Sequence, residues 1–194
     1  MAVQQPSRPV SLATPEAEDA AVPSTALRVL AVVRIATGMV FLWPFLDKAL
    51  GLGYSTASEN AWVRGGSPAE GYLSSVTVGP LESVFQSWAG VALVDWLYMA
   101  GMGGLGISLV LGIGLRVTAI AGPLLMLTLW LSMYPPARHA SDGTPTMSTN
   151  PLIDQHVVFA GVMVAVALCS AGRVYGLGGW WERTQLVRSF PWLR

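Results

Sequence analysis

Five ionisable side chains lie inside or at the edges of strongly apolar stretches of this chain. They are Arg34, Lys48, Asp95, Asp154 and His156. Hydrocarbon solvates charge poorly, so an ionisable group in such a setting usually faces protein or water and marks a binding site or a proton relay. These five residues are therefore the candidate ligand-binding, quinone-binding or proton-relay site.

Arg34 is the deepest of the five, since it lies about two helical turns beyond Leu27, where the first apolar run begins. No carboxylate is expected at the same depth. One interpretation is that Arg34 reaches cytoplasmic phosphates or caps helix carbonyls. The other is that it binds an anionic or carbonyl group of a ligand, such as a quinone oxygen, inside the bundle.

Lys48, Asp95, Asp154 and His156 are expected near the opposite, external end of the apolar stretches. Asp95 is flanked by apolar residues and needs a cation nearby, for which Lys48 is the candidate. A buried Lys48–Asp95 pair would orient a ligand or relay protons through His156. The alternative is an interfacial belt of ordinary salt bridges without a ligand.

Residues that bind metals and haem are few. Cys169 is the single cysteine, which excludes a disulfide, a CxxC redox pair and a multi-cysteine zinc or iron–sulfur site within these residues. The two histidines do not favour a bis-histidine haem, because His139 lies in a loop rich in Pro, Ser and Thr. Asp154 and His156 alone are too few ligands for a metal. We therefore expect no metal, haem or iron–sulfur site.

Four apolar stretches must position these side chains. Each has about the 20 residues that a helix needs to cross a bilayer, and a backbone in lipid must satisfy its own hydrogen bonds. The stretches are Leu27–Leu46, Gly90–Leu111, Val117–Tyr134 and Val157–Gly172. Asn150-Pro151 supplies an N-cap and first-turn proline for the last one. The fold class is predicted to be all-α: a polytopic membrane protein with an antiparallel four-helix transmembrane bundle over residues 26–182.

The distribution of charge orients this bundle. With the N-terminus inside, seven arginines fall on inner segments and three basic residues on outer segments, so the positive-inside rule places both termini in the cytoplasm of a cell-membrane protein. Residues 1–25 are expected to form a disordered cytoplasmic tail, and residues 183–194 a second tail. The net charge of zero gives no reason to expect nucleic acid as a partner.

The external segment of residues 50–89 is predicted to be an ordered, partly helical cap. Ser67-Pro68-Ala69-Glu70 has the form of a capping box, and an apolar stripe after Pro80 predicts a second short helix. The candidate binding residues of this loop are Trp62, Arg64 and Glu70.

Several segments resemble the DoxX family, and more specifically the DoxD-like small subunits of thiosulfate:quinone oxidoreductases. These segments are Leu30–Lys48, Trp62–Tyr72, Val94–Trp96, Leu111–Arg116 and Asn150–His156. The external loop and the Asn-Pro-Leu-Ile-Asp-Gln-His run are the specific parts. The resemblance implies a four-helix membrane protein linked to quinone redox chemistry, with a quinone as cofactor. The expected partners are the lipid bilayer and a second redox subunit or another copy of the chain.

The leading hypothesis is a membrane subunit of a quinone-linked redox system, and, if it is an enzyme, a thiosulfate dehydrogenase-like oxidoreductase. A net-negative external face and the lack of a cysteine to bond sulfur count against thiosulfate itself. The alternative is a non-enzymatic membrane scaffold that binds a redox or stress-defence partner through its external loop. A third class, a solute or ion pathway, rests on the intramembrane charges and would need oligomerisation.

Overall fold

The computed structural model describes residues 23–194. The predicted disordered tail, residues 1–25, therefore lies outside the described residues except for its last three. Of these, Ser24 and Thr25 already belong to the first helix.

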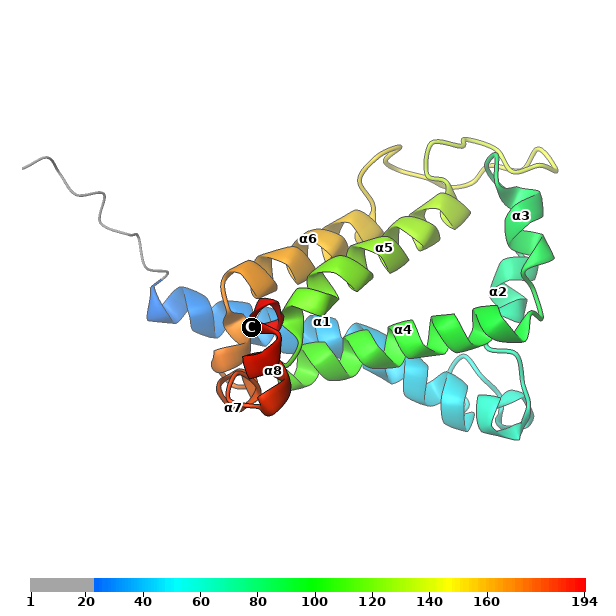
Figure 1. The fold of residues 1–194 in the computed structure, drawn as a ribbon. Coiled ribbons are helices and arrows are strands. Elements are labelled where there is room, and N and C mark those ends of the chain that lie inside the picture. Colours follow the sequence, from blue (N-terminus) through cyan, green and yellow to red (C-terminus); the bar gives the residue numbers. More distant parts are fainter. Residues whose placement is uncertain (1–22) are drawn as a thin grey trace, which may run out of the picture.

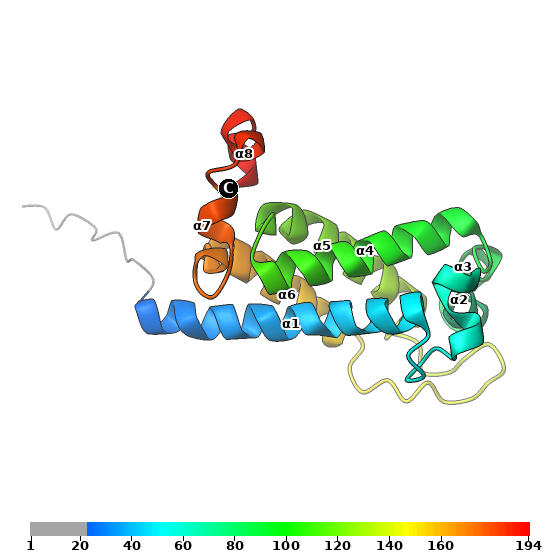
Figure 2. The ribbon, with the colours of Figure 1, turned by 90° about the horizontal axis from the view of Figure 1, so that it is seen from below.

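Four long helices run along a common direction, with α1 beside α4 and α5 beside α6 (Figures 1 and 2). Their bounds are α1 Ser24–Leu50, α4 Ala92–Leu111, α5 Leu115–Met133 and α6 Gln155–Leu168. Helices α1 and α4 end where Gly51 and Gly112 adopt positive φ, which glycine tolerates without steric cost. Pro44 and Pro123 lie inside α1 and α5.

The fourth helix is shorter than predicted. α1, α4 and α5 are long and apolar enough to cross a membrane, whereas α6 has 14 residues, about 21 Å at 1.5 Å per residue. The all-helical prediction is thus confirmed for residues 23–194, but a bundle of four membrane-crossing helices is not. The chain leaves the helix at Cys169, and Ser170 takes a φ of 50°. This turn brings the carbonyls of Val174 and Tyr175 to Arg34.

The predicted partly helical cap is present at one end of the bundle, which we call the cap end. Its helices are η1 Ser58–Asn60, η2 Trp62–Arg64, α2 Glu70–Ser74 and α3 Glu82–Ser87. The capping box is wrong in detail, because α2 has no side-chain cap and Ser67 instead bonds Asp95. The predicted cap of the last long helix also differs. The Asn150 side chain accepts from the N–H groups of Leu152 and Ile153, and Asp154 is the residue that caps α6.

The opposite end carries the C-terminal segment, residues 171–194, which projects from the bundle in Figure 2. Its short helices are η3 Ala171–Arg173, α7 Gly178–Trp181, α8 Gln185–Ser189 and η4 Pro191–Leu193.

Two apolar clusters hold these parts together. The larger one lies between the long helices and includes Phe41, Leu105, Met126 and Met163. The smaller one packs α2 and α3 of the cap around Leu73 and Phe85, against Val94, Tyr98 and Leu131 of α4 and α5. The cap is therefore part of the folded domain.

Candidate functional site

Arg34 is fully buried and donates to four main-chain carbonyl oxygens. Nη1 donates to Leu109 and to Val110 at 3.1 Å, and Nη2 donates to Val174 at 3.1 Å and to Tyr175 at 3.0 Å. The first two carbonyls end α4, where the helix dipole favours a cation. These contacts match the interpretation in which Arg34 caps helix carbonyls, and they join α1, α4 and the C-terminal segment.

Asp95 is also buried, but its partners are not those expected from the sequence. Its Oδ2 accepts from the Ser67 hydroxyl at 2.7 Å, and its Oδ1 accepts from the Ala69 N–H at 2.9 Å. No ion pair within 4 Å joins it to Lys48 in the described part of the chain, so the predicted Lys48–Asp95 salt bridge is wrong. Two neutral donors satisfy the carboxylate, because the cap lies directly on the start of α4. Asp95 thus fixes the cap.

Lys48 instead lines a polar cavity of about 750 Å³ under the cap, together with Ser67 and Glu70. The other two loop candidates lie outside its walls. Trp62 packs edge-on against Trp96 of α4, with ring centroids 4.5 Å apart, and Arg64 donates to the exposed Ser58 hydroxyl.

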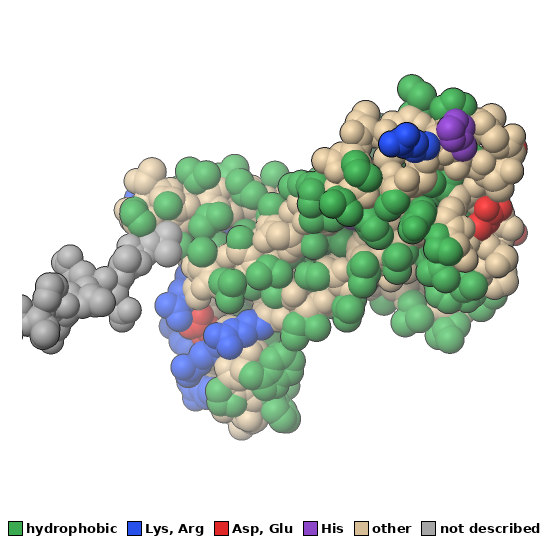
Figure 3. Space-filling view, turned by 90° about the horizontal axis from the view of Figure 1, so that it is seen from above, with side chains coloured by type: hydrophobic (Ala, Val, Ile, Leu, Met, Phe, Trp, Pro, Cys, Tyr) green, Lys and Arg blue, Asp and Glu red, His purple; other side chains and the backbone are tan. Residues whose placement is uncertain are grey.

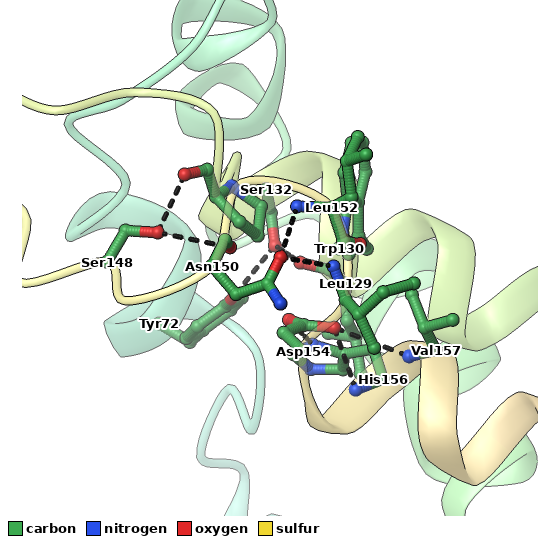
Figure 4. A network of polar contacts seen from close by, with 12 residues as sticks. Tyr72, Leu129, Trp130, Ser132, Ser148, Asn150, Leu152, Asp154, His156 and Val157 are labelled. Atoms are coloured by element: carbon green, nitrogen blue, oxygen red, sulfur yellow. Dashed lines mark hydrogen bonds and ion pairs between the residues drawn. The ribbon is translucent and has the colours of Figure 1, made fainter.

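Asp154 and His156 form a local pair at the start of α6 (Figure 4). The His156 Nδ1 lies 2.7 Å from Asp154 Oδ2, while Asp154 Oδ1 accepts from the backbone N–H groups of His156 and Val157. Burial raises the pKa of Asp154, but these hydrogen bonds outweigh it and hold the pKa below its ordinary value. Asp154 therefore caps α6, and His156 braces that cap.

The five candidate residues therefore do not form one site. Arg34 lies at the end of α4 opposite to Asp95, and within residues 23–194 no hydrogen bond or ion pair links Lys48 or Asp95 to the Asp154–His156 pair. Three of them, Arg34, Asp95 and Asp154, stabilise helix ends or the cap.

A partly open apolar pocket lies elsewhere, between α4 and α5. These helices diverge toward the cap end in Figure 1, and α2 and α3 lie across that end. The resulting lateral pocket has a volume of about 540 Å³. Its walls carry no charged side chain and consist of Ala69, Tyr72, Leu73, Phe85, Trp88, Val91, Leu93, Val94, Leu97, Tyr98, Leu125, Thr128, Leu129 and Ser132.

A short hydroxyl chain supplies polarity to this lateral pocket. Ser132 donates to the Leu129 carbonyl at 2.7 Å, so the Tyr72 hydroxyl, 2.6 Å from Ser132 Oγ, acts as donor in their bond (Figure 4). Burial raises the pKa of Tyr72 above its ordinary value, and the bond to Ser132 only partly opposes this. The phenol is therefore protonated at neutral pH and can donate to a carbonyl oxygen.

Tyr72 lines three cavities at once. Besides the lateral pocket, it borders the polar cavity that holds Lys48 and a second polar cavity of about 280 Å³ beside Thr77 and Thr144. The phenol thus stands at the boundary between the apolar pocket and polar space under the cap.

The lateral pocket was missed from the sequence, although part of its signal was there. Leu125, Thr128, Leu129 and Ser132 repeat at i, i+3, i+4 and i+7, which puts two hydroxyls on one stripe of α5. Such a stripe normally packs against a neighbouring helix. Here residues of α2 and α3 in the cap line the same space, so the stripe forms a pocket wall.

Among residues 23–194, no group of three or more His, Cys, Asp or Glu side chains is arranged to hold a metal ion. Comparison of the chain with protein-family models, with curated proteins and with solved structures finds no match.

Proposed function

We propose that this chain is a membrane protein that binds a quinone in the lateral pocket between α4 and α5, as a subunit of a quinone-linked redox system. The observation that carries the proposal is the pocket itself: about 540 Å³, walled almost wholly by apolar side chains, with a hydroxyl donor at its cap end. Pockets of about 300–1,000 Å³ with few polar groups are typical of small-ligand sites.

The residues of the lateral pocket fit a quinone by size and by chemistry. Phe85, Trp88 and Tyr98 offer aromatic surface to a flat ring. The side of the pocket includes Leu93 and Leu97, which are 67% and 65% exposed on α4, so an isoprenoid tail could leave directly into lipid. Three apolar helices of spanning length support placement in a membrane.

Tyr72 would orient the bound ring. Its hydroxyl can turn from Ser132 to donate to a quinone carbonyl, while the lone pairs of Ser132 can accept from the hydroxyl of the reduced form. A quinone supplies reversible two-electron chemistry when bound. Electrons would come from a partner subunit, and the resemblance to the DoxX family makes thiosulfate the first reductant to screen.

Mass spectrometry of lipids extracted from the detergent-purified protein tests this proposal. Thr128 is exposed and lines the lateral pocket, so Thr128→Trp should fill it without disturbing the core. Leu124, one turn away and 60% exposed, lies outside the lining, which makes Leu124→Trp the matched control. We expect near-stoichiometric quinone in the wild type and the control, and a loss of at least tenfold in Thr128→Trp.

The test also separates the two main functional classes. Absence of quinone from the wild type, both as purified and after addition of menaquinone or ubiquinone, would contradict the proposal. It would favour the scaffold alternative, and identification of a protein that co-purifies through the cap would then be the next step.

A further inference from the structure

We propose that the end of the protein opposite the cap binds an anionic glycerophospholipid in a groove between the C-terminal segment and the flanks of α4 and α5. This inference concerns a second site and does not depend on quinone binding. It rests on three observations that lie together in the structure: an apolar groove, unpaired arginines and exposed aromatic side chains.

The first observation is the groove, which has a volume of about 500 Å³. One wall is made by small residues of α4, among them Gly101 and Gly104, and the other by Trp181, Leu186 and Leu193 of the C-terminal segment. Its lining carries no charged side chain. A groove of this kind accommodates an acyl chain.

The second observation is positive charge close in sequence to residues that line the groove. Arg116 adjoins the lining residue Val117, Arg194 adjoins Leu193, and Arg188 lies two residues beyond Leu186. All three arginines are exposed, and within residues 23–194 none of them takes part in an ion pair. Figure 3 shows basic side chains gathered at this end of the molecule, beside an apolar surface.

The one acidic residue in the C-terminal segment is already engaged. Glu182 accepts from Arg173 Nε at 2.8 Å and from Arg173 Nη2 at 2.9 Å. The Arg173 guanidinium lowers the pKa of Glu182 and keeps it ionised. Arg194 also helps to lower the pKa of Glu182, whereas Arg188 takes part in no ion pair within residues 23–194 and can donate to a phosphate.

The third observation is the aromatic surface of the C-terminal segment. Trp180, Phe190 and Trp192 are 58%, 53% and 53% exposed. Tryptophan beside arginine is typical of the membrane interface, where the ring lies at headgroup depth and the guanidinium meets phosphate.

These observations favour a phospholipid over a protein partner. The flank of α4 and α5 beside the groove exposes Ile107, Val117 and Ile120, which a membrane would cover with hydrocarbon. The lining of the groove itself contains no arginine. A phospholipid has an apolar tail and an anionic headgroup. One molecule can therefore place its tail in the groove and its phosphate beside the arginines.

Native mass spectrometry of the delipidated, full-length protein would test the site by titration with phosphatidylglycerol and phosphatidylcholine of the same acyl chains. We expect phosphatidylglycerol to bind at least tenfold more tightly than phosphatidylcholine, and the double variant Arg188→Gln/Arg194→Gln to lose that preference. The matched control is Arg64→Gln/Arg138→Gln, which removes two positive charges from the cap end and should leave the preference intact.

A second pair of variants tests the groove separately. A side chain at Gly104 would meet no atom within 4 Å of its Cβ, so Gly104→Phe should fill the groove and lower the affinity for both lipids. Gly161 is equally free of close neighbours but lies on α6 outside the groove, so Gly161→Phe should bind as the wild type does. Equal affinity for the two lipids in the wild type would overturn the proposal. A dimer that Gly104→Phe dissociates would also overturn it, because a second copy would then occupy the groove.

Discussion

At Arg34, the two terminal nitrogens of a guanidinium buried between apolar helices donate to carbonyl oxygens instead of a carboxylate, while Nε has no hydrogen-bond partner among residues 23–194. Four carbonyls from two separate chain segments point at its two terminal nitrogens, and the free C-terminal end of α4 adds a favourable dipole. Gly112 belongs to the same arrangement. It has a φ of +71°, and a Cβ there would lie 2.7 Å from Arg34 Nη1. The depth of Arg34 in an apolar helix therefore drew attention to a residue whose hydrogen bonds are all to main-chain carbonyls.

Arg34→Ala should destabilise the protein by about 3 kcal/mol, because it leaves buried carbonyls without donors. Arg34→Lys should recover only part of this, since an ammonium cannot reach both pairs of carbonyls as the planar guanidinium does. Thermal unfolding in detergent, followed by circular dichroism, measures the effect. The quinone content of the folded fraction should stay unchanged. Loss of quinone at unchanged stability would instead show that Arg34 binds the ligand.

Asp154 predicts a pH dependence at the start of α6. Its folded pKa is lower than the ordinary aspartate value of about 3.9, so its stabilisation is complete above that value and is lost as the pH falls through the folded pKa. Protection factors for amide exchange at Gln155–Phe159 should therefore drop on acidification from about pH 6 to about pH 3. Asp154→Asn keeps a cap without a titrating group and should show protection that is independent of pH in this range. The same drop in Asp154→Asn would assign the effect to another group.

At the scale of elements, the cap depends on two buried carboxylates at helix ends. Asp47, near the end of α1, accepts from the backbone N–H groups of Tyr54 and Ser55, and Asp95, near the start of α4, accepts from Ser67 and Ala69. Both acids hold loop backbone in place. This matters for the proposed function, because Ala69 also lines the lateral pocket.

Asp95→Ala should loosen the cap without unfolding the bundle. The change leaves the Ala69 N–H and the Ser67 hydroxyl without an acceptor, at a cost of about 1–3 kcal/mol that falls on the cap. Hydrogen exchange over residues 67–74 should increase, and bound quinone should decrease with it. Glu59→Ala, at an exposed position of the same loop, is the control and should change neither. An unaltered exchange rate in Asp95→Ala would argue against a role of Asp95 in holding the cap in place.

The elements and the contacts differed in how far the sequence could predict them. α1, α4 and α5 follow from long, mainly apolar runs, because a backbone exposed to lipid has no alternative to a helix. The partners of Asp95 could not be predicted, because an N–H of Ala69 has no side-chain signature. The early end of α6 depends on the turn that reaches Arg34, a contact over 140 residues of sequence. Local patterns thus predict elements, and long-range backbone contacts decide the site.

For the whole molecule, we propose that the short α6 and the turn that follows it together make a fourth membrane crossing beside α1, α4 and α5. It starts at the cap end, since Trp130 near the end of α5 donates to the Leu152 carbonyl just before it. It ends at the other side, where Gly172 lies so close to Gly112 that a Cβ at Gly172 would clash with it. Residues 155–172 therefore run from beside the last turns of α5 to the Gly112 end of α4, and their last residues lie outside the helix. This geometry supports the proposal of four crossings.

Four crossings predict that the cap lies on one side of the membrane and the C-terminal segment on the other. The side of the membrane on which each segment lies can be measured with single introduced cysteines. Cys169→Ser provides the cysteine-free background, because Cys169 is the one native thiol. Ser58→Cys, in the cap, should react with a membrane-impermeant maleimide in intact cells. Ser189→Cys, exposed in the C-terminal segment, should react only after permeabilisation, since the excess of arginines keeps that segment inside. Both thiols reacting in intact cells would mean three crossings, with α6 packed against the others without traversing the bilayer.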